Sequence, residues 1–138
     1  MRVVVVDAGP LVALFDTRDE EHAWAVGTLK RLSVPIVTCD AVLAETCFLL
    51  SHDPNAVNAL VESVERGLFR SAFELQPQVR RVRGLMQRYV SVPMSFADAC
   101  LVRMTELHPD VHVWTLDSDF RIYRRHGRQA IPTIMPSE

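Results

Sequence analysis

The chain has 138 residues, of which 49% are hydrophobic and 23% charged, and its formal net charge is −2 at pH 7. These values are typical of a single globular domain over 1–138, and no apolar run approaches the ~20 residues that a membrane-spanning helix requires. The apolar cluster Val3–Val6 stops at Asp7 with no cleavage site after it, so we expect no signal peptide, no membrane contact and a cytoplasmic location.

The first half of the chain is predicted to alternate short strands with helices. It opens with a β-branched run typical of a strand buried on both faces in a parallel sheet. Asp53 and Pro54 then mark the start of a later helix, as an N-cap followed by proline at the first helical position. The predicted strands are 1–6 and 35–38, and the predicted helices are 9–15, 20–32, 41–50 and 54–67.

The second half continues the same alternation. The predicted strands are 71–75, 111–116 and 130–135, and the predicted helices are 77–89, a helix capped by Ser95 and ending at Leu107, and 120–125. Strands that alternate with helices indicate the α/β class. We therefore expect a three-layer α/β/α sandwich around a mainly parallel sheet of four or five strands.

Three acids stand at the ends of predicted strands. Asp7 ends the first strand, and Asp117 and Asp119 follow the strand at 111–116. In open α/β sheets, ligands bind at the carboxyl ends of the strands near the switch in strand order. The alternative is that each acid only caps the helix that follows it, since Asp is a favoured N-cap.

Two further acids lie within predicted helices. Glu45 is the one charge inside an apolar helix, where a buried carboxylate requires a partner or a metal, although a solvent-facing position remains the alternative. Asp98 follows Ser95 in a capping-box arrangement that is purely structural in many helices. Its small neighbours Ala97 and Cys100 allow close packing, which favours an interior edge for this carboxylate.

These acids predict a metal site if they meet in the fold. Carboxylates at ~4 Å separations would repel by roughly 4 kcal/mol per adjacent pair at an effective dielectric constant of 20, and a divalent cation removes that penalty. Neither histidine nor cysteine stands at ligand spacing, so the available ligands are hard oxygens. Such ligands favour Mg²⁺ or Mn²⁺ over zinc.

Cysteine content and charge distribution add two observations. Cys39, Cys47 and Cys100 show no C-x-x-C spacing, so we expect buried, reduced thiols and neither a disulfide framework nor a zinc site. Residues 1–65 hold four cations against ten acids, whereas 66–138 hold eleven arginines against seven acids. Arginine suits phosphate recognition, and this asymmetry weakly supports a nucleic-acid substrate.

The order and spacing of these fragments resemble the PIN-domain family, and within it the single-domain, VapC-like ribonuclease toxins of toxin–antitoxin pairs. One departure is Ala8, where many relatives place Thr or Ser, so another group or a water must replace that hydroxyl. The position of Asp119 is variable in the family. The fragments that carry the resemblance are VVVDAGPL at 4–11, the segment 16–22, Glu45, SFADA at 95–99 and TLDSDF at 115–120.

The resemblance implies a metal-dependent endoribonuclease that leaves a 5′-phosphate and a 3′-hydroxyl. Asp7, Glu45, Asp98 and Asp117 would be the catalytic, metal-binding acids, with Asp119 as a candidate fifth ligand. The expected cofactor is Mg²⁺ or Mn²⁺, and the expected partners are RNA, an antitoxin protein and a second copy of the chain in a homodimer.

Arginines near the site would bind substrate phosphates, and ordinary solvated helix faces are the alternative. The candidates are Arg80, Arg83, Arg121 and Arg124.

Two other functions remain open. A non-catalytic PIN-like interaction module would keep the fold and bind only a partner. A phosphoryl-transfer or receiver-type domain would use Asp117 or Asp119 as its phosphorylated residue. Receiver-type sites commonly need a lysine, and the only lysine, Lys30, lies in an early helix away from the expected site.

Overall fold

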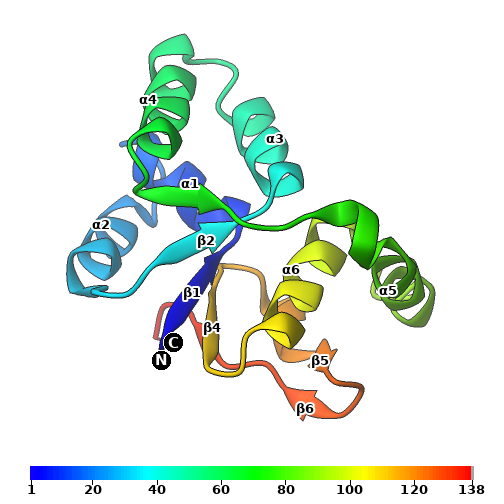
Figure 1. Cartoon of the computed structure of the whole chain (residues 1–138). Coiled ribbons are helices and arrows are strands. Elements are labelled where there is room, and N and C mark those ends of the chain that lie inside the picture. The colour runs from blue at the N-terminus through cyan, green and yellow to red at the C-terminus, as the bar shows by residue number, and fades with distance from the viewer. Residues whose placement is uncertain (138) are drawn as a thin grey trace.

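The protein is built on a five-stranded sheet, seen in a computed structural model that describes residues 1–137 (Figure 1). Every pairing in this sheet is parallel, which confirms the expected architecture. The strand order is β3-β2-β1-β4-β7. The strands are β1 (Val3–Val6), β2 (Ile36–Thr38), β3 (Phe69–Ser71), β4 (Val111–Trp114) and β7 (Thr133–Ile134).

Helices cover both faces of the sheet. Figure 1 shows α1, α2 and α4 on one side and α5 and α6 on the other. Helix α3 starts beyond the carboxyl end of β2 and packs against both α1 and α6. The helices are α1 (Ala8–Phe15), α2 (His22–Arg31), α3 (Asp40–Leu49), α4 (Pro54–Glu65), α5 (Leu75–Arg88) and α6 (Phe96–Leu107).

The core explains why β1 lies at the centre of the sheet. All four valines of β1 are buried, since helices cover this strand on both faces. The chain runs outward from β1 through β2 to β3 and then returns to β4 on the other side of β1. The switch in strand order therefore falls between β1 and β4, where Asp7 and Asp117 follow the two strands.

Helix starts follow the predicted capping chemistry. The Asp53 side chain accepts hydrogen bonds from the backbone N–H groups of Asn55 and Ala56, and Pro54 occupies the first helical position. The Ser95 hydroxyl accepts from the backbone N–H of Asp98. These contacts satisfy backbone donors that have no partner within the helix.

The strand predicted at 71–75 is displaced towards the N-terminus. The observed strand β3 covers Phe69–Ser71, and Phe69 is its one fully buried residue. Residues 74–77 are exposed, and helix α5 begins at Leu75. The prediction was wrong because burial of Phe69 against the core sets the position of the strand.

The C-terminal segment departs most from prediction. The helix expected at 120–125 is a short 3-10 helix, η1 (Ser118–Arg121), followed by β5 (Arg124–Arg125). Strand β5 pairs antiparallel with β6 (Gln129–Ala130) through a turn in which Gly127 has a φ of 80°. The last strand, expected at 130–135, is divided into β6 and β7 because Pro132, between them, has no N–H to donate.

Candidate metal centre

Asp7 is the most deeply placed acid of the site. Its backbone N–H continues the sheet by donating to the Trp114 carbonyl at 2.9 Å, and only 7% of the residue is exposed. Its Oδ1 accepts from the Ala8 N–H at 2.8 Å, and its Oδ2 accepts from the Thr115 hydroxyl at 2.7 Å. Both oxygens are therefore oriented by neighbouring groups.

The environment of Asp7 opposes ionisation. Burial raises the pKa of this carboxyl to about 7, although the hydrogen bonds from Thr115 and Ala8 lower it. The negative charges of Asp98 and Glu45 raise the pKa further. Because charges act strongly only at short range in a protein, three acids from different segments face one region.

Asp98 lies in the first turn of α6 and is half-buried. Its Oδ2 accepts a 2.9 Å hydrogen bond from the Tyr123 hydroxyl. Burial raises the pKa of Asp98, and the charges of Asp117 and Asp119 add to that rise. The Ser95 hydroxyl caps α6 as expected. The Asp98 carboxylate also belongs to a group of five acids, here called the acidic group: Asp7, Glu45, Asp98, Asp117 and Asp119.

Glu45 reaches the same region from α3. Burial raises the pKa of its carboxyl, and repulsion from Asp98 and Asp117 raises it further. As a residue Glu45 is exposed, and α3 also leaves Phe48 76% exposed and Leu49 46% exposed. Some apolar side chains of α3 are therefore buried in the core, and others form an exposed apolar face.

Asp117 and Asp119 stand at the end of β4. Asp117 Oδ1 accepts from the Asp119 N–H at 2.9 Å and so caps the short helix η1. The Asp117 N–H donates to the Thr115 hydroxyl oxygen at 2.9 Å. Capping and membership of the acidic group are compatible, since the capping bond uses one oxygen of Asp117.

The five acids form a group without yet forming a closed coordination shell. Each acts electrostatically on at least one other. Within residues 1–137, no three Asp, Glu, His or Cys side chains already stand in a ligating arrangement. Carboxylates that repel one another separate where their side chains allow it, and Glu45 on the exposed side of α3 has that freedom.

Two hydroxyls that support the acids are not evident from sequence. Thr115 supplies the side-chain hydroxyl that is missing at Ala8. The sequence feature that could have indicated this role is the position of Thr115 at the start of the TLDSDF segment. Tyr123 lies outside the recognised fragments. Its ring packs edge-on against Tyr89 and Phe120, each at a centroid distance of 5.2 Å, which fixes the hydroxyl beside Asp98.

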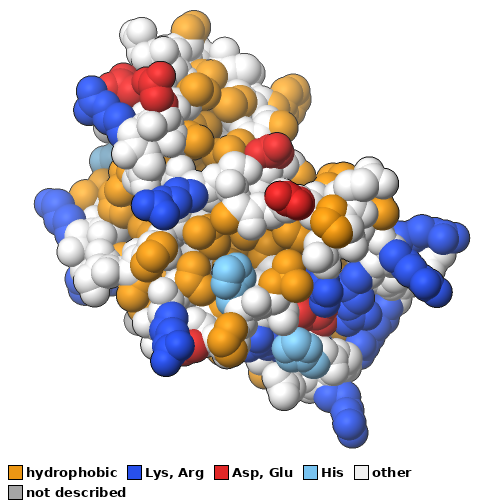
Figure 2. Space-filling view, viewed as in Figure 1, with side chains coloured by type: hydrophobic (Ala, Val, Ile, Leu, Met, Phe, Trp, Pro, Cys, Tyr) orange, Lys and Arg blue, Asp and Glu red, His pale blue; other side chains and the backbone are white. Residues whose placement is uncertain are grey.

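The arginines have different roles around this centre. Arg80 and Arg83 are exposed on α5, and Figure 2 shows cationic side chains gathered over that helix. Arg121 is exposed on η1. The Arg124 guanidinium donates to the backbone carbonyls of Arg121, Ile122 and Tyr123, so it stabilises its own loop.

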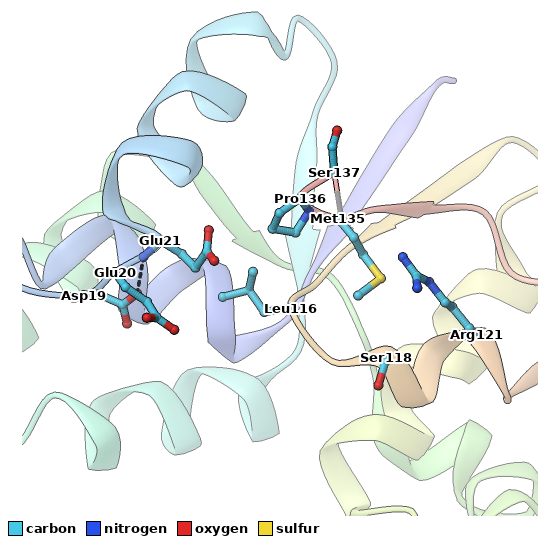
Figure 3. Close-up of a pocket in the computed structure, with 9 residues that line it drawn as sticks. All are labelled: Asp19, Glu20, Glu21, Leu116, Ser118, Arg121, Met135, Pro136 and Ser137. Carbon is cyan, nitrogen blue, oxygen red and sulfur yellow. Dashed lines mark hydrogen bonds between the residues drawn. The ribbon is translucent and has the colours of Figure 1, made fainter.

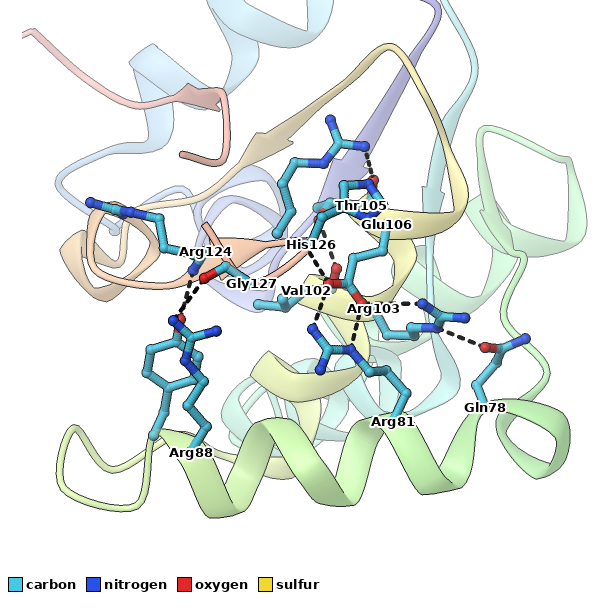
Figure 4. A network of polar contacts seen from close by, with 12 residues as sticks. Gln78, Arg81, Arg88, Val102, Arg103, Thr105, Glu106, Arg124, His126 and Gly127 are labelled. Carbon is cyan, nitrogen blue, oxygen red and sulfur yellow. Dashed lines mark hydrogen bonds and ion pairs between the residues drawn. The ribbon is translucent and has the colours of Figure 1, made fainter. Parts of the chain in front are cut away.

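A polar network holds the C-terminal hairpin against α5 and α6 (Figure 4). The Glu106 side chain, only 1% exposed, accepts two hydrogen bonds from Arg81 at 2.9 and 2.8 Å and one from Arg103 at 3.2 Å. It also accepts from the His126 N–H at 2.7 Å. These donors lower the pKa of Glu106 to about 2 despite its burial.

A pocket of about 510 Å³ lies beside the acidic group. Figure 3 shows Glu20 and Glu21 on one wall, Leu116 in the middle and Arg121 on the opposite wall. Leu116 adjoins Asp117 in sequence, but none of the five acids lines this pocket. The pocket is therefore a neighbour of the candidate centre and not the centre itself.

Comparison with known proteins identifies the family of this fold. The model of the PIN domain family matches residues 4–125, and the chain belongs to this family. Its fold is similar to that of the toxin VapC20 of Mycobacterium tuberculosis, described as cleaving the sarcin–ricin loop, with a TM-score of 0.77 at 19% sequence identity. That match covers 84% of this chain and 91% of the other. A search of the curated proteins found no match.

The helices were compared with the requirements for crossing a membrane. Over residues 1–137, none of the helices has both the length and the apolar character required to cross a bilayer.

Proposed function

We propose that this PIN-domain protein is an endoribonuclease that depends on Mg²⁺ or Mn²⁺. Asp7, Glu45, Asp98 and Asp117 are its metal-binding, catalytic acids, and Asp119 is a fifth candidate ligand. The observation that carries the proposal is that carboxylates from four separate segments gather near the switch in strand order, where repulsion adds to burial in raising the pKa of Asp7, Glu45 and Asp98. A fold that keeps such repulsion without a counter-charge would lose stability.

The residues fit a hard divalent cation. The donors are carboxylate oxygens, and both oxygens of Asp7 are already oriented by Ala8 and Thr115. When bound, such a cation supplies Lewis acidity at a phosphate oxygen and neutralises the acids. Asp117 or Asp119 accepts a hydrogen bond from the attacking water, and Asp7 remains fixed by its two donors.

The proposed substrate is RNA, bound through its phosphates by exposed arginines. Arg80 and Arg83 on α5 present an exposed cationic surface, and Arg121 stands two residues after Asp119. Arg124 is a fourth candidate, although its guanidinium already serves three carbonyls. Similarity of fold to a toxin that cleaves the sarcin–ricin loop supports an RNA substrate.

We also propose that the protein is the toxin of a toxin–antitoxin pair. An antitoxin requires a surface to bind, and the apolar face of α3 and α4 offers one, with Phe48 76% exposed and Val61 55% exposed. In Figure 1 these two helices rise together above the sheet. An antitoxin cation placed near Glu45 would neutralise the acidic group.

A homodimer is proposed on a different surface. Val90 is 73% exposed, and together with Val79 and Phe96 it lines an almost wholly apolar pocket of about 310 Å³ on α5 and the start of α6. Exposed apolar surface of this kind favours association. Sedimentation of the wild type should give twice the mass found for Val90→Asp, and equal masses would contradict this interface.

One experiment tests the proposed reaction. Wild type, Asp7→Asn and Asp98→Asn are each incubated with structured and single-stranded RNA in Mg²⁺, Mn²⁺ or EDTA. Cleavage by the wild type with either metal, and by neither variant, is expected, with 5′-phosphate product ends. Equal cleavage by all three proteins would refute the assignment. Metal binding by the wild type without cleavage would instead favour the non-catalytic interaction module.

A further inference from the structure

A pair of thiols joins the two helices that carry Glu45 and Asp98. Cys39 lies at the N-cap of α3, and Cys100 lies in the second turn of α6. The two side chains line the same pocket, although 61 positions separate them in sequence. Helices α3 and α6 are packed together, so the two thiols lie at an interface between helices.

The two thiols are nearly buried but line a pocket. Cys39 and Cys100 are only 1% and 2% exposed, yet both line a pocket of about 340 Å³. Ala41, Phe73, Leu75 and Phe96 form the rest of its apolar wall, and Asp40 also lines it. Leu75 and Phe96 are themselves 37% and 42% exposed. We expect a pocket of this volume to admit hydrogen peroxide more readily than a bulky peptide disulfide.

The start of α3 activates one of the two sulfurs. The neighbouring Cys100 side chain lowers the pKa of Cys39, and the backbone at the start of α3 adds to this effect, whereas burial and the charge of Asp40 oppose it. A thiolate at a helix N-terminus, next to a second thiol, has the arrangement of a reactive cysteine with its resolving partner.

We propose that Cys39 and Cys100 are a redox modification site. The two residues form a reversible disulfide with each other when a peroxide oxidises them. The Cys39 thiolate attacks one oxygen of the peroxide, which breaks the O–O bond, forms a sulfenic acid and releases hydroxide. The Cys100 thiol then attacks the sulfenic sulfur, the S–S bond forms and water leaves. Overall, two thiols lose two electrons and two protons, and one peroxide is reduced to two waters.

The bond changes the candidate metal centre. A covalent S–S bond is shorter than any non-bonded contact between two thiols, so the start of α3 is drawn towards α6. Glu45 lies six residues after Cys39, and Asp98 lies two residues before Cys100. Oxidation therefore alters the spacing of these two acids and inhibits cleavage, a consequence that rests on the proposed nuclease function.

The bond itself is tested without any assay of cleavage. Purified wild type is treated with hydrogen peroxide, unfolded in N-ethylmaleimide and weighed by mass spectrometry. One maleimide on Cys47 is expected in place of three, with three again after dithiothreitol. Glutathione disulfide should react far more slowly. Three maleimides after peroxide treatment, or a disulfide that includes Cys47, would overturn the proposal.

Variants and an activity measurement complete the test. Cys47→Ser is the matched control because Cys47 is the more accessible thiol of α3, and it should still lose two thiols. Cys39→Ser and Cys100→Ser should form no intramolecular disulfide, and loss of both remaining maleimide sites in either would refute the pairing. If reduced wild type does not cleave RNA, the nuclease proposal fails while the disulfide stands. If oxidised and reduced proteins cleave equally, the effect on the metal centre is refuted.

Discussion

The Thr115 hydroxyl joins Asp7 to the end of the neighbouring strand. It donates to Asp7 Oδ2 at 2.7 Å and accepts from the Asp117 N–H at 2.9 Å. Residues 108 positions apart in sequence are thereby held at the switch in strand order. This side chain replaces the hydroxyl that Ala8 cannot supply, so the support of the first acid comes from β4 and not from the residue that follows it.

Thr115→Val should weaken metal binding more than it affects the fold. The variant keeps the shape of the side chain but leaves Asp7 Oδ2 without its donor and the Asp117 N–H without its acceptor. Loss of such a supporting contact typically reduces metal affinity by about 10–100-fold. A buried unpaired group destabilises by roughly 1–3 kcal/mol. Mn²⁺ titration by calorimetry and thermal unfolding measure the two effects. Thr115→Ser retains the hydroxyl and should keep nearly wild-type affinity; an equal loss there would contradict this role.

Asp7→Asn should make the metal-free protein more stable at neutral and alkaline pH. The pKa of Asp7 in the folded protein is about 7, against an ordinary value of 3.8. The folded state therefore holds the proton more tightly than the unfolded chain, and stability falls as pH rises from about 4 through 7. In EDTA, the variant should exceed the wild type at pH 8 by on the order of 2 kcal/mol, and the difference should shrink towards pH 5. A constant difference across this range would show that Asp7 does not titrate as inferred.

Divalent metal should raise the melting temperature of the wild type and not that of Asp98→Asn. Binding to the folded state alone stabilises a protein by about 2.7 kcal/mol when the free ligand is at 100 times its Kd. The measurement is thermal unfolding in increasing Mn²⁺ and, separately, in NaCl of equal ionic strength as a control. Asp53→Asn is the matched variant, because Asp53 caps α4 and takes no part in the acidic group. Equal stabilisation of Asp98→Asn and wild type would place the metal elsewhere.

Tyr123→Phe should reduce metal affinity with little change in stability. The ring contacts with Tyr89 and Phe120 are kept, and only the 2.9 Å hydrogen bond to Asp98 Oδ2 is lost. A net stability change of about 1 kcal/mol is expected, with a decrease of about tenfold in Mn²⁺ affinity. If the Mn²⁺ affinity were unchanged, Tyr123 would contribute only to packing and not to the metal centre.

Glu106→Gln should destabilise the fold without affecting metal binding. The substitution removes the charge that Arg81 and Arg103 share, although Arg81 is partly solvent-screened at 37% exposure. A loss on the order of 2 kcal/mol at pH 7 is expected. Because the folded pKa is about 2 and the ordinary value is 4.5, this contribution is complete above about pH 5 and disappears as pH falls towards 2. Unfolding in urea at pH 7 and pH 3 checks the expected convergence of variant and wild type.

Local sequence patterns predicted the elements whose signals lie within a few residues. The β-branched run of β1 and the Asp53-Pro54 helix start needed no distant contact to be recognised. Patterns failed where a distant contact decides. Burial of Phe69 set the position of β3, and the pairing of β5 with β6 replaced the helix expected after Phe120.

The sequence by itself determined the α/β class, the burial of β1 on both faces and the acids that follow the strands, because periodicity, capping residues and oxygen ligands are properties of short segments. Only the tertiary structure decided that Thr115 and Tyr123 support Asp7 and Asp98, that Glu45 lies on an exposed side of α3, and that Cys39 meets Cys100. The pairings join residues far apart in the chain, and the exposure of Glu45 depends on which elements pack against α3. Their proximity depends on strand order and helix packing, which no local pattern specifies.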